Sequence, residues 1–125
     1  MNNQSRIIAI YTSRGDPGAF LMYPYLFNTQ GEWIGWVTPQ REVYSILGVF
    51  VGRLSNDPRI LGKRVEEYTH PKKMPPFIPE RIYPPATIPL APLMPELSYD
   101  TVDILYEEPE LLHTLDAGDL RKDLD

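Results

Sequence analysis

The sequence predicts a small all-β domain, a repeat-built meander or barrel of about four hairpins, followed by an extended proline-rich arm and a short C-terminal helix. Two observations support this architecture: a repeated strand–turn–strand pattern in the first half and a dense run of prolines in the second. A chain of 125 residues has room for one domain. Within it we delimit a β-repeat domain over residues 1–70, the arm over residues 71–97, and an acidic segment with a short helix over residues 98–125.

The repeat has an offset of 17 residues. One copy spans Leu26–Val37 and the next spans Val43–Leu54, and both contain the pattern G-x-[WF]-[IV]-G-x-[VL]. The same offset reaches the apolar pairs Ala9-Ile10 and Ile60-Leu61. We therefore expect the first strand of the unit to recur about four times.

The second strand of the unit is clear only in the two middle copies. Gly18–Tyr23 can supply it in the first copy, whereas Val65–Tyr68 matches poorly in the last. The turn Asn28–Gly31 ends in glycine, which suits a hairpin loop with one left-handed position. Strict alternation predicts two faces for the second strand of the first middle copy. They are a core face of Trp33, Gly35 and Val37 and an opposite face of Ile34, Trp36 and Thr38.

The repeated spacing of turn glycines and apolar residues in YLFNTQGEWIGWV and EVYSILGVFVGRL resembles that of the four-fold β-flower group and, more distantly, of PRC-barrel-type small β domains. The resemblance covers roughly residues 7–62, about half of the chain. It implies a small β-repeat fold. Because PRC-type domains are associated with assembly and scaffolding, it also implies an interaction role, and it transfers no catalytic residue.

Charge is unevenly distributed along the chain, whose net charge is −5. Residues 1–95 carry 10 Lys/Arg and 7 Asp/Glu, whereas residues 96–125 carry 2 Lys/Arg and 10 Asp/Glu. The absence of cysteine excludes disulfides and cysteine-ligated metals. The first residues lack a signal-peptide pattern, and the longest apolar run, Ile46–Val51, is too short to span a membrane. These features predict a cytoplasmic protein without membrane contact.

The arm carries nine prolines between Pro71 and Pro95, which excludes a helix or a central strand and favours extended polyproline II. Large apolar residues lie among these prolines, so we expect the arm to wrap the β domain or embrace a partner subunit. A weaker alternative is that Lys73–Pro79 is a docking peptide for an SH3-type groove. The residues predicted to make interactions are Trp36, Arg53, Phe77, Ile78, Ile82 and Tyr83.

The acidic C-terminal segment contains two candidate elements. Thr101–Tyr106 can form a short strand or a helical turn, and Pro109–Ala117 resembles a helix with Gly118 as its stop. Glu110 and His113 have the spacing of one half of a helical metal site, but such a site needs ligands from facing helices. The sequence therefore predicts no catalytic residue, no cofactor and no metal site.

The function predicted from these features is a non-enzymatic structural or protein-interaction module that self-associates through its proline-rich arm. The alternative is a β domain that binds a small ligand or single-stranded nucleic acid on an aromatic face around Trp36. The sequence pI of about 5.0 and the acidic tail disfavour nucleic acid. An enzyme without a recognisable motif is a third possibility.

Overall fold

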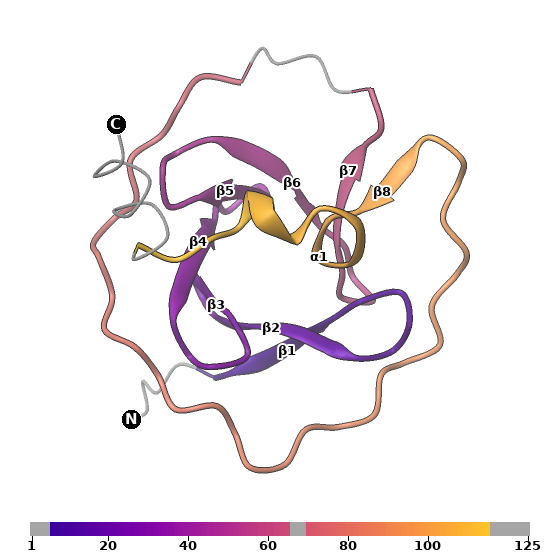
Figure 1. Cartoon of the computed structure of the whole chain (residues 1–125), viewed down its shortest axis with the longest axis horizontal. Coiled ribbons are helices and arrows are strands. Elements are labelled where there is room, and N and C mark those ends of the chain that lie inside the picture. The colour runs from indigo at the N-terminus through magenta and orange to yellow at the C-terminus, as the bar shows by residue number, and fades with distance from the viewer. Residues whose placement is uncertain (1–5, 66–69, 116–125) are drawn as a thin grey trace.

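The computed structural model describes residues 6–65 and 70–115. Eight strands form one antiparallel sheet in which each strand pairs with the next along the chain. The sheet curls into a half-barrel, so the prediction of an all-β meander is confirmed (Figure 1). The strands are β1 (Ile8–Tyr11), β2 (Pro17–Met22), β3 (Tyr25–Phe27), β4 (Trp33–Val37), β5 (Glu42–Ser45), β6 (Phe50–Leu54), β7 (Ile60–Lys63) and β8 (Thr101–Asp103).

The sheet contains four repeat hairpins, β1–β2, β3–β4, β5–β6 and β7–β8. The apolar pairs spaced by 17 residues lie in the first strand of each hairpin, as the repeat predicted. The second strand of the fourth hairpin is β8, which comes from the C-terminal segment after the arm. Residues 66–68 of the poorly matching Val65–Tyr68 lie outside the described residues. The arm therefore connects two neighbouring strands of the sheet.

The loops between strands repeat one hydrogen-bonded design. In the β3–β4 loop, the Asn28 amide donates to the Glu32 carbonyl (2.8 Å) and the Gly31 amide donates to the Asn28 carbonyl (3.0 Å). The Asn28 side chain accepts from the amides of Gln30 and Glu32. Four further loops have the same backbone link between their first residue and the residue four positions later. These loops begin at Thr12, Thr38, Ser45 and Ser55.

The predicted strict alternation in β4 is wrong, because the strand contains a bulge. Phe27 pairs with Trp33 and Leu26 pairs with Gly35, which leaves Ile34 as an extra residue. A bulge of this kind places two consecutive residues of one strand opposite one residue of its partner. The hairpins β1–β2 and β5–β6 have a register shift at the corresponding place.

The bulge redistributes side chains between the two faces of the sheet. Trp33 and Trp36 lie together on the outer face, whereas Ile34 and Val37 lie in the inner core. The inner cluster fills the concave side of the half-barrel and contains Ile10, Ala19, Leu21, Leu26, Ile34, Val37, Val43, Val51, Leu54, Ile60, Val102, Ile104 and Leu112. The outer cluster contains Phe27, Trp33, Trp36, Tyr44, Ile46 and Phe50.

The C-terminal segment covers the concave side of the sheet. Helix α1 (Ile104–Glu107) follows β8 directly, and η1 (Pro109–Leu111) is a single 3-10 turn. A short helix near the C-terminus is present, as predicted, but it spans Ile104–Glu107. In the predicted range Pro109–Ala117, the 3-10 turn is followed by irregular backbone over residues 112–114, and residues 116 and 117 lie outside the described residues. The helix starts earlier because the Asp103 carboxylate accepts a hydrogen bond from the Tyr106 amide (3.4 Å). In the part of the chain that the structure describes, no helix is long and apolar enough to span a bilayer.

Candidate interaction surface

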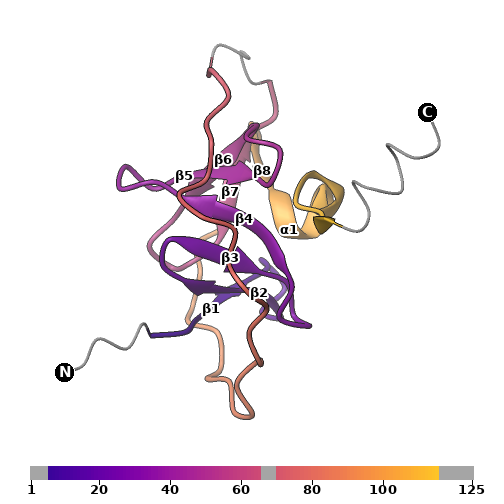
Figure 2. The same ribbon diagram turned by 90° about the vertical axis from the view of Figure 1, so that its left-hand side faces the viewer.

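The proline-rich arm runs around the outside of the half-barrel as a nearly complete ring (Figure 1). Seen from the side, it crosses the convex face over β3, β4 and β5, while α1 lies to the right of these strands (Figure 2). The phenol of Tyr11 donates to the Pro89 carbonyl (2.7 Å), and the Phe77 amide donates to the Tyr25 hydroxyl (3.1 Å). The arm therefore wraps its own β domain within a single chain.

Two equivalent turns of the sheet hold the arm by the same contact. The Ile82 amide donates to the Gly31 carbonyl (2.9 Å), and the Lys73 amide donates to the Gly48 carbonyl (3.0 Å). Both glycines have positive φ, +86° and +83°. A Cβ atom on Gly31 or Gly48 would clash with the carbonyl oxygen of Ile82 or Lys73. Each turn thus needs glycine for two reasons, the left-handed backbone and the close approach of the arm.

The arm carries a repeat of its own that matches the two turns. Residues 72–76 read Lys-Lys-Met-Pro-Pro and residues 81–85 read Arg-Ile-Tyr-Pro-Pro, an offset of nine residues. In both copies the docked residue follows a basic residue and precedes an apolar residue and two prolines. Nine residues make three turns of a polyproline II helix, so both copies present the same face to the sheet.

Burial along the arm repeats every three residues. From residue 79 to residue 97, every third side chain is half-buried against the domain. These residues are Pro79, Ile82, Pro85, Ile88, Ala91, Met94 and Leu97. A period of three is that of the polyproline II helix, so one of its three faces contacts the domain and two face outward.

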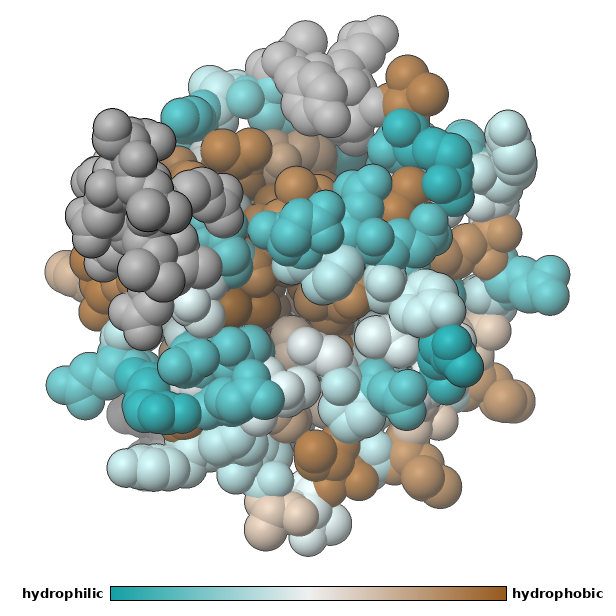
Figure 3. Space-filling view, in the orientation of Figure 1, coloured by the Kyte–Doolittle hydropathy of each residue, from teal (hydrophilic) through white to brown (hydrophobic). Residues whose placement is uncertain are grey.

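The outward faces of the arm carry large apolar side chains. Leu93 is 100% exposed and Leu90 is 94% exposed, and the others are 68% to 86% exposed. We call this set the apolar belt, and it consists of Met74, Phe77, Ile78, Tyr83, Leu90 and Leu93. Brown apolar residues at the periphery of the surface view lie where the arm runs (Figure 3). Such a concentration of exposed apolar side chains is typical of a contact surface.

The structure separates the predicted interaction residues into three groups. Trp36 is buried in the outer cluster, stacked on Tyr44 with ring centroids 5.1 Å apart. Ile82 is half-buried and packs against the same cluster. Arg53 is exposed, with its guanidinium 5.1 Å from the centre of the Phe50 ring. The remaining three, Phe77, Ile78 and Tyr83, belong to the apolar belt.

The end of the arm is fixed by a buried arginine, Arg59, which was not among the predicted interaction residues. Arg59 is 2% exposed; its guanidinium donates to the Ser13 hydroxyl (2.8 Å) and to the Pro95 carbonyl (3.0 Å). It also forms an ion pair with Asp57 (2.7 Å). Partial burial alone would raise the pKa of Asp57, but hydrogen bonds from Arg59 and Ser55 hold this pKa below its usual value. Arg59 thus ties together the β1–β2 loop, the β6–β7 loop and the arm.

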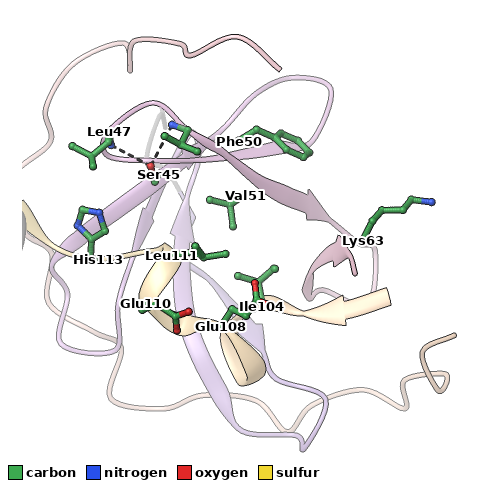
Figure 4. Close-up of a pocket in the computed structure, with 11 residues that line it drawn as sticks. Ser45, Leu47, Phe50, Val51, Lys63, Ile104, Glu108, Glu110, Leu111 and His113 are labelled. Carbon is green, nitrogen blue, oxygen red and sulfur yellow. Dashed lines mark hydrogen bonds between the residues drawn. The ribbon is translucent and has the colours of Figure 1, made fainter. Parts of the chain in front are cut away.

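The mouth of the half-barrel contains a cavity of about 340 Å³. Val51, Ile104 and Leu111 supply apolar walls, and Glu108 and Glu110 lie along its rim (Figure 4). The Ser45 hydroxyl faces the cavity but already accepts hydrogen bonds from two loop amides, those of Leu47 and Val49. The lining is completed by Leu47, Val49, Phe50, Lys63 and His113.

Comparisons of the chain with protein-family models, with curated proteins and with solved structures find no match. The eight-stranded half-barrel is compatible with a small barrel-like β domain, as the repeat suggested. Evidence for a function therefore comes from the surface of this chain itself.

The sequence analysis did not predict that the turns at Gly31 and Gly48 hold the arm, or that the arm contains a repeat. Both features leave a pattern in the sequence, since the arm has a nine-residue repeat and the sheet has a 17-residue repeat. The nine-residue repeat is difficult to recognise, since any proline-rich stretch contains short fragments similar to Lys-Lys-Met-Pro-Pro by chance.

Proposed function

We propose that this chain is a non-enzymatic protein-interaction module that self-associates through its proline-rich arm. The observation that carries the proposal is the apolar belt. One face of the arm holds the sheet, while Leu90, Leu93 and Tyr83 on the other faces are 94%, 100% and 85% exposed. Leaving such side chains in water forgoes roughly 1.5 to 3 kcal/mol for each large apolar side chain that could be buried. A partner that covers the belt recovers this free energy.

The arm is also suited to association because it is already ordered on the domain. An extended proline-rich chain has few conformations to lose, so little entropy opposes its contact with another surface. Its backbone carbonyls and apolar side chains are presented together on the outward faces. Binding through such a surface needs no catalytic group.

The charge of the described residues favours a second copy of this chain as the partner. The beginning of the arm exposes the basic residues Lys72, Lys73 and Arg81. The end of the arm and the segment after it expose acidic residues, which are Glu96, Asp100, Glu107, Glu108 and Glu110. Two copies that meet with their arms in opposite directions bring unlike charges together.

The test is the solution mass of the full-length chain, measured by light scattering over a wide range of concentration. We expect a mass of at least twice the 14.4 kDa of one chain at high concentration, and a shift toward the monomer as salt is added. A triple variant, Phe77→Ser with Leu90→Ser and Leu93→Ser, should remain monomeric. The control replaces two exposed polar arm residues, Glu80→Ser with Thr87→Ser, and should associate as the natural chain does. A wild-type chain that is monomeric at every concentration would refute self-association.

The cavity at the mouth of the half-barrel supports a second candidate, the binding of a small ligand. Its volume of about 340 Å³ lies within the range of small-molecule sites, and its walls are mainly apolar with polar groups at the rim. Titration with an apolar fluorescent dye tests this candidate. Val51→Trp would fill the cavity and should abolish dye binding, whereas an unchanged signal in this variant would exclude the cavity as the binding site.

A further inference from the structure

The turn between β1 and β2 is a third copy of the turns that hold the arm. The Thr12 amide donates to the Asp16 carbonyl (2.8 Å) and the Gly15 amide donates to the Thr12 carbonyl (2.9 Å), as in the β3–β4 loop. Gly15 has a φ of +91°, close to the values at Gly31 and Gly48. The backbone that receives the arm at two turns is therefore repeated at a third.

This third turn is open. Among the described residues, no atom outside its chain neighbours lies within 4 Å of the position that a Cβ on Gly15 would occupy. At Gly31 and Gly48 that same position is filled by a carbonyl of the arm. The β1–β2 turn thus presents a docking position that its own arm leaves free.

The arm also contains a stretch whose outward faces are free. At both docked positions, the docked residue is followed by an apolar residue and then proline, in Lys73–Pro75 and Ile82–Pro84. The same order recurs in Leu90–Pro92 and Leu93–Pro95. Leu90 and Leu93 are the most exposed apolar residues of the arm. The chain therefore carries an open docking turn and arm segments that share part of the docked pattern, with proline in place of the basic residue before Leu90 and Leu93 and a single proline after them.

The open turn and this arm segment lie side by side. Ser13 from the turn lines one cavity of about 380 Å³ together with Met94 and Pro95 from the arm. A surface that carries both halves of a contact is self-complementary. A two-fold axis beside it lets each copy present its arm to the other's turn in the same interface.

We propose that residues 90–95 of one chain dock on the Gly15 turn of a second copy, and that the reciprocal contact forms a two-fold dimer. This inference rests on the proposed self-association and specifies its interface. An amide of the arm donates to the Gly15 carbonyl of the other copy, as the Ile82 amide does to Gly31 within one chain. Leu90 and Leu93 become buried against the other copy.

Disulfide trapping tests the interface directly, because the natural chain contains no cysteine. A chain carrying Asp16→Cys is mixed with a chain carrying Leu93→Cys, and the disulfide between the two chains is followed by mass spectrometry under mild oxidation. The control mixture pairs Asp16→Cys with Tyr83→Cys. Tyr83 is 85% exposed, so it is well accessible to oxidation, as Leu93 is. It belongs, however, to the arm segment that is already docked at Gly31. We expect the first mixture to form the mixed disulfide several-fold faster than the control.

A second variant measures the contribution of the turn itself. Gly15→Ala places a methyl group where the partner's carbonyl would lie, so we expect the dimer dissociation constant to rise about tenfold. Circular dichroism of the variant at low concentration checks that the monomer remains folded.

The outcomes separate this inference from the proposed function. Self-association, faster formation of the disulfide between positions 16 and 93, and weaker dimerisation of Gly15→Ala would together support both the proposed function and this interface. Association with equal disulfide rates in the two mixtures would overturn this interface and leave self-association standing. A chain that is monomeric at every concentration would overturn both.

Discussion

Replacing Gly31 by alanine should destabilise the protein more than the same replacement at Gly15. Both glycines occupy the same place in equivalent loops, with φ values of +86° and +91°. They differ in their surroundings, since Gly31 receives the arm at Ile82 and Gly15 has open space around it among the described residues. Gly15→Ala is thus a matched control that isolates the contribution of arm docking.

The expected losses of stability combine the cost of a left-handed alanine and the loss of the hydrogen bond to the arm. Alanine in the left-handed region costs roughly 1 to 2 kcal/mol relative to a favourable conformation, and this cost applies at both turns. At Gly31 the added methyl group also displaces the Ile82 carbonyl and breaks the arm's hydrogen bond, which costs about 1 kcal/mol more. We therefore expect a loss of about 1 to 2 kcal/mol for Gly15→Ala and about 2 to 3 kcal/mol for Gly31→Ala. Gly48→Ala should resemble Gly31→Ala, because Lys73 docks there in the same way.

Urea unfolding, followed by tryptophan fluorescence at a chain concentration low enough to keep the protein monomeric, measures these differences. Trp33 and Trp36 are suitable reporters because both belong to the outer cluster against which Ile82 packs. A difference of 1 kcal/mol between variants shifts the unfolding midpoint by roughly 0.5 M urea for a domain of this size. The shift is well within the precision of the method.

Equal destabilisation at Gly15 and Gly31 would refute the reasoning. It would mean that the left-handed conformation accounts for the whole effect and that the arm does not rest on the turn in solution. Destabilisation at Gly31 without a comparable loss at Gly48 would show that only one of the two repeat contacts forms.

Three further predictions concern the buried Arg59–Asp57 pair at the end of the arm and the inner core. Arg59→Met should lower the free energy of unfolding by about 3 kcal/mol, because it leaves Asp57 without its buried partner and frees Ser13 and Pro95; a urea midpoint equal to that of the natural chain would contradict it. Since the folded pKa of Asp57 lies below its ordinary value of 3.8, this carboxylate stabilises the fold above that pH. The contribution should disappear as the pH falls through the folded pKa, and Asp57→Asn should show less acid dependence of the urea midpoint between about pH 5 and pH 2. Leu112→Ala should cost about 3 kcal/mol by opening a cavity in the inner core, measured by thermal unfolding, and a loss under about 1 kcal/mol would show that Leu112 is not packed there.

The hairpins could be predicted from the sequence because the turn chemistry repeats with the strands. Glycine at the left-handed position and a polar residue at the start of each loop mark where strands end. The fourth hairpin could not be completed in the same way, because its second strand lies beyond the arm. Thr101–Asp103 is too short to show a period, and only pairing with β7 makes it a strand.

The faces of the strands were harder to predict than their positions. Alternation distinguishes faces only when one side of a sheet meets water, and β4 is buried on both sides by the inner core and the outer cluster. The available signal was Gly35, where the Tyr44 carbonyl lies only 2.5 Å from the position of a Cβ atom. A glycine between large residues in each middle copy marks the place where the neighbouring strand approaches too closely for a side chain.

The candidate interaction surface was predicted in part. Extended proline-rich sequence with large apolar residues indicated an arm that contacts the domain. Which of those residues face inward depends on the three-residue period and on where the first contact is made. The sequence does not specify that contact, because it does not show which turn of the sheet lies beside which part of the arm.

Because the arm joins adjacent strands and is held along its length, we expect a break in its middle to leave both halves attached to the domain. A single cut between Ala86 and Thr87 gives two pieces, and each keeps its own attachments. The first piece holds residues 72–85 against its turns, whereas the second retains Pro89 on Tyr11, Pro95 on Arg59, and β8 in the sheet. The fold is therefore suited to fragment complementation, in which two separately produced pieces rebuild one half-barrel.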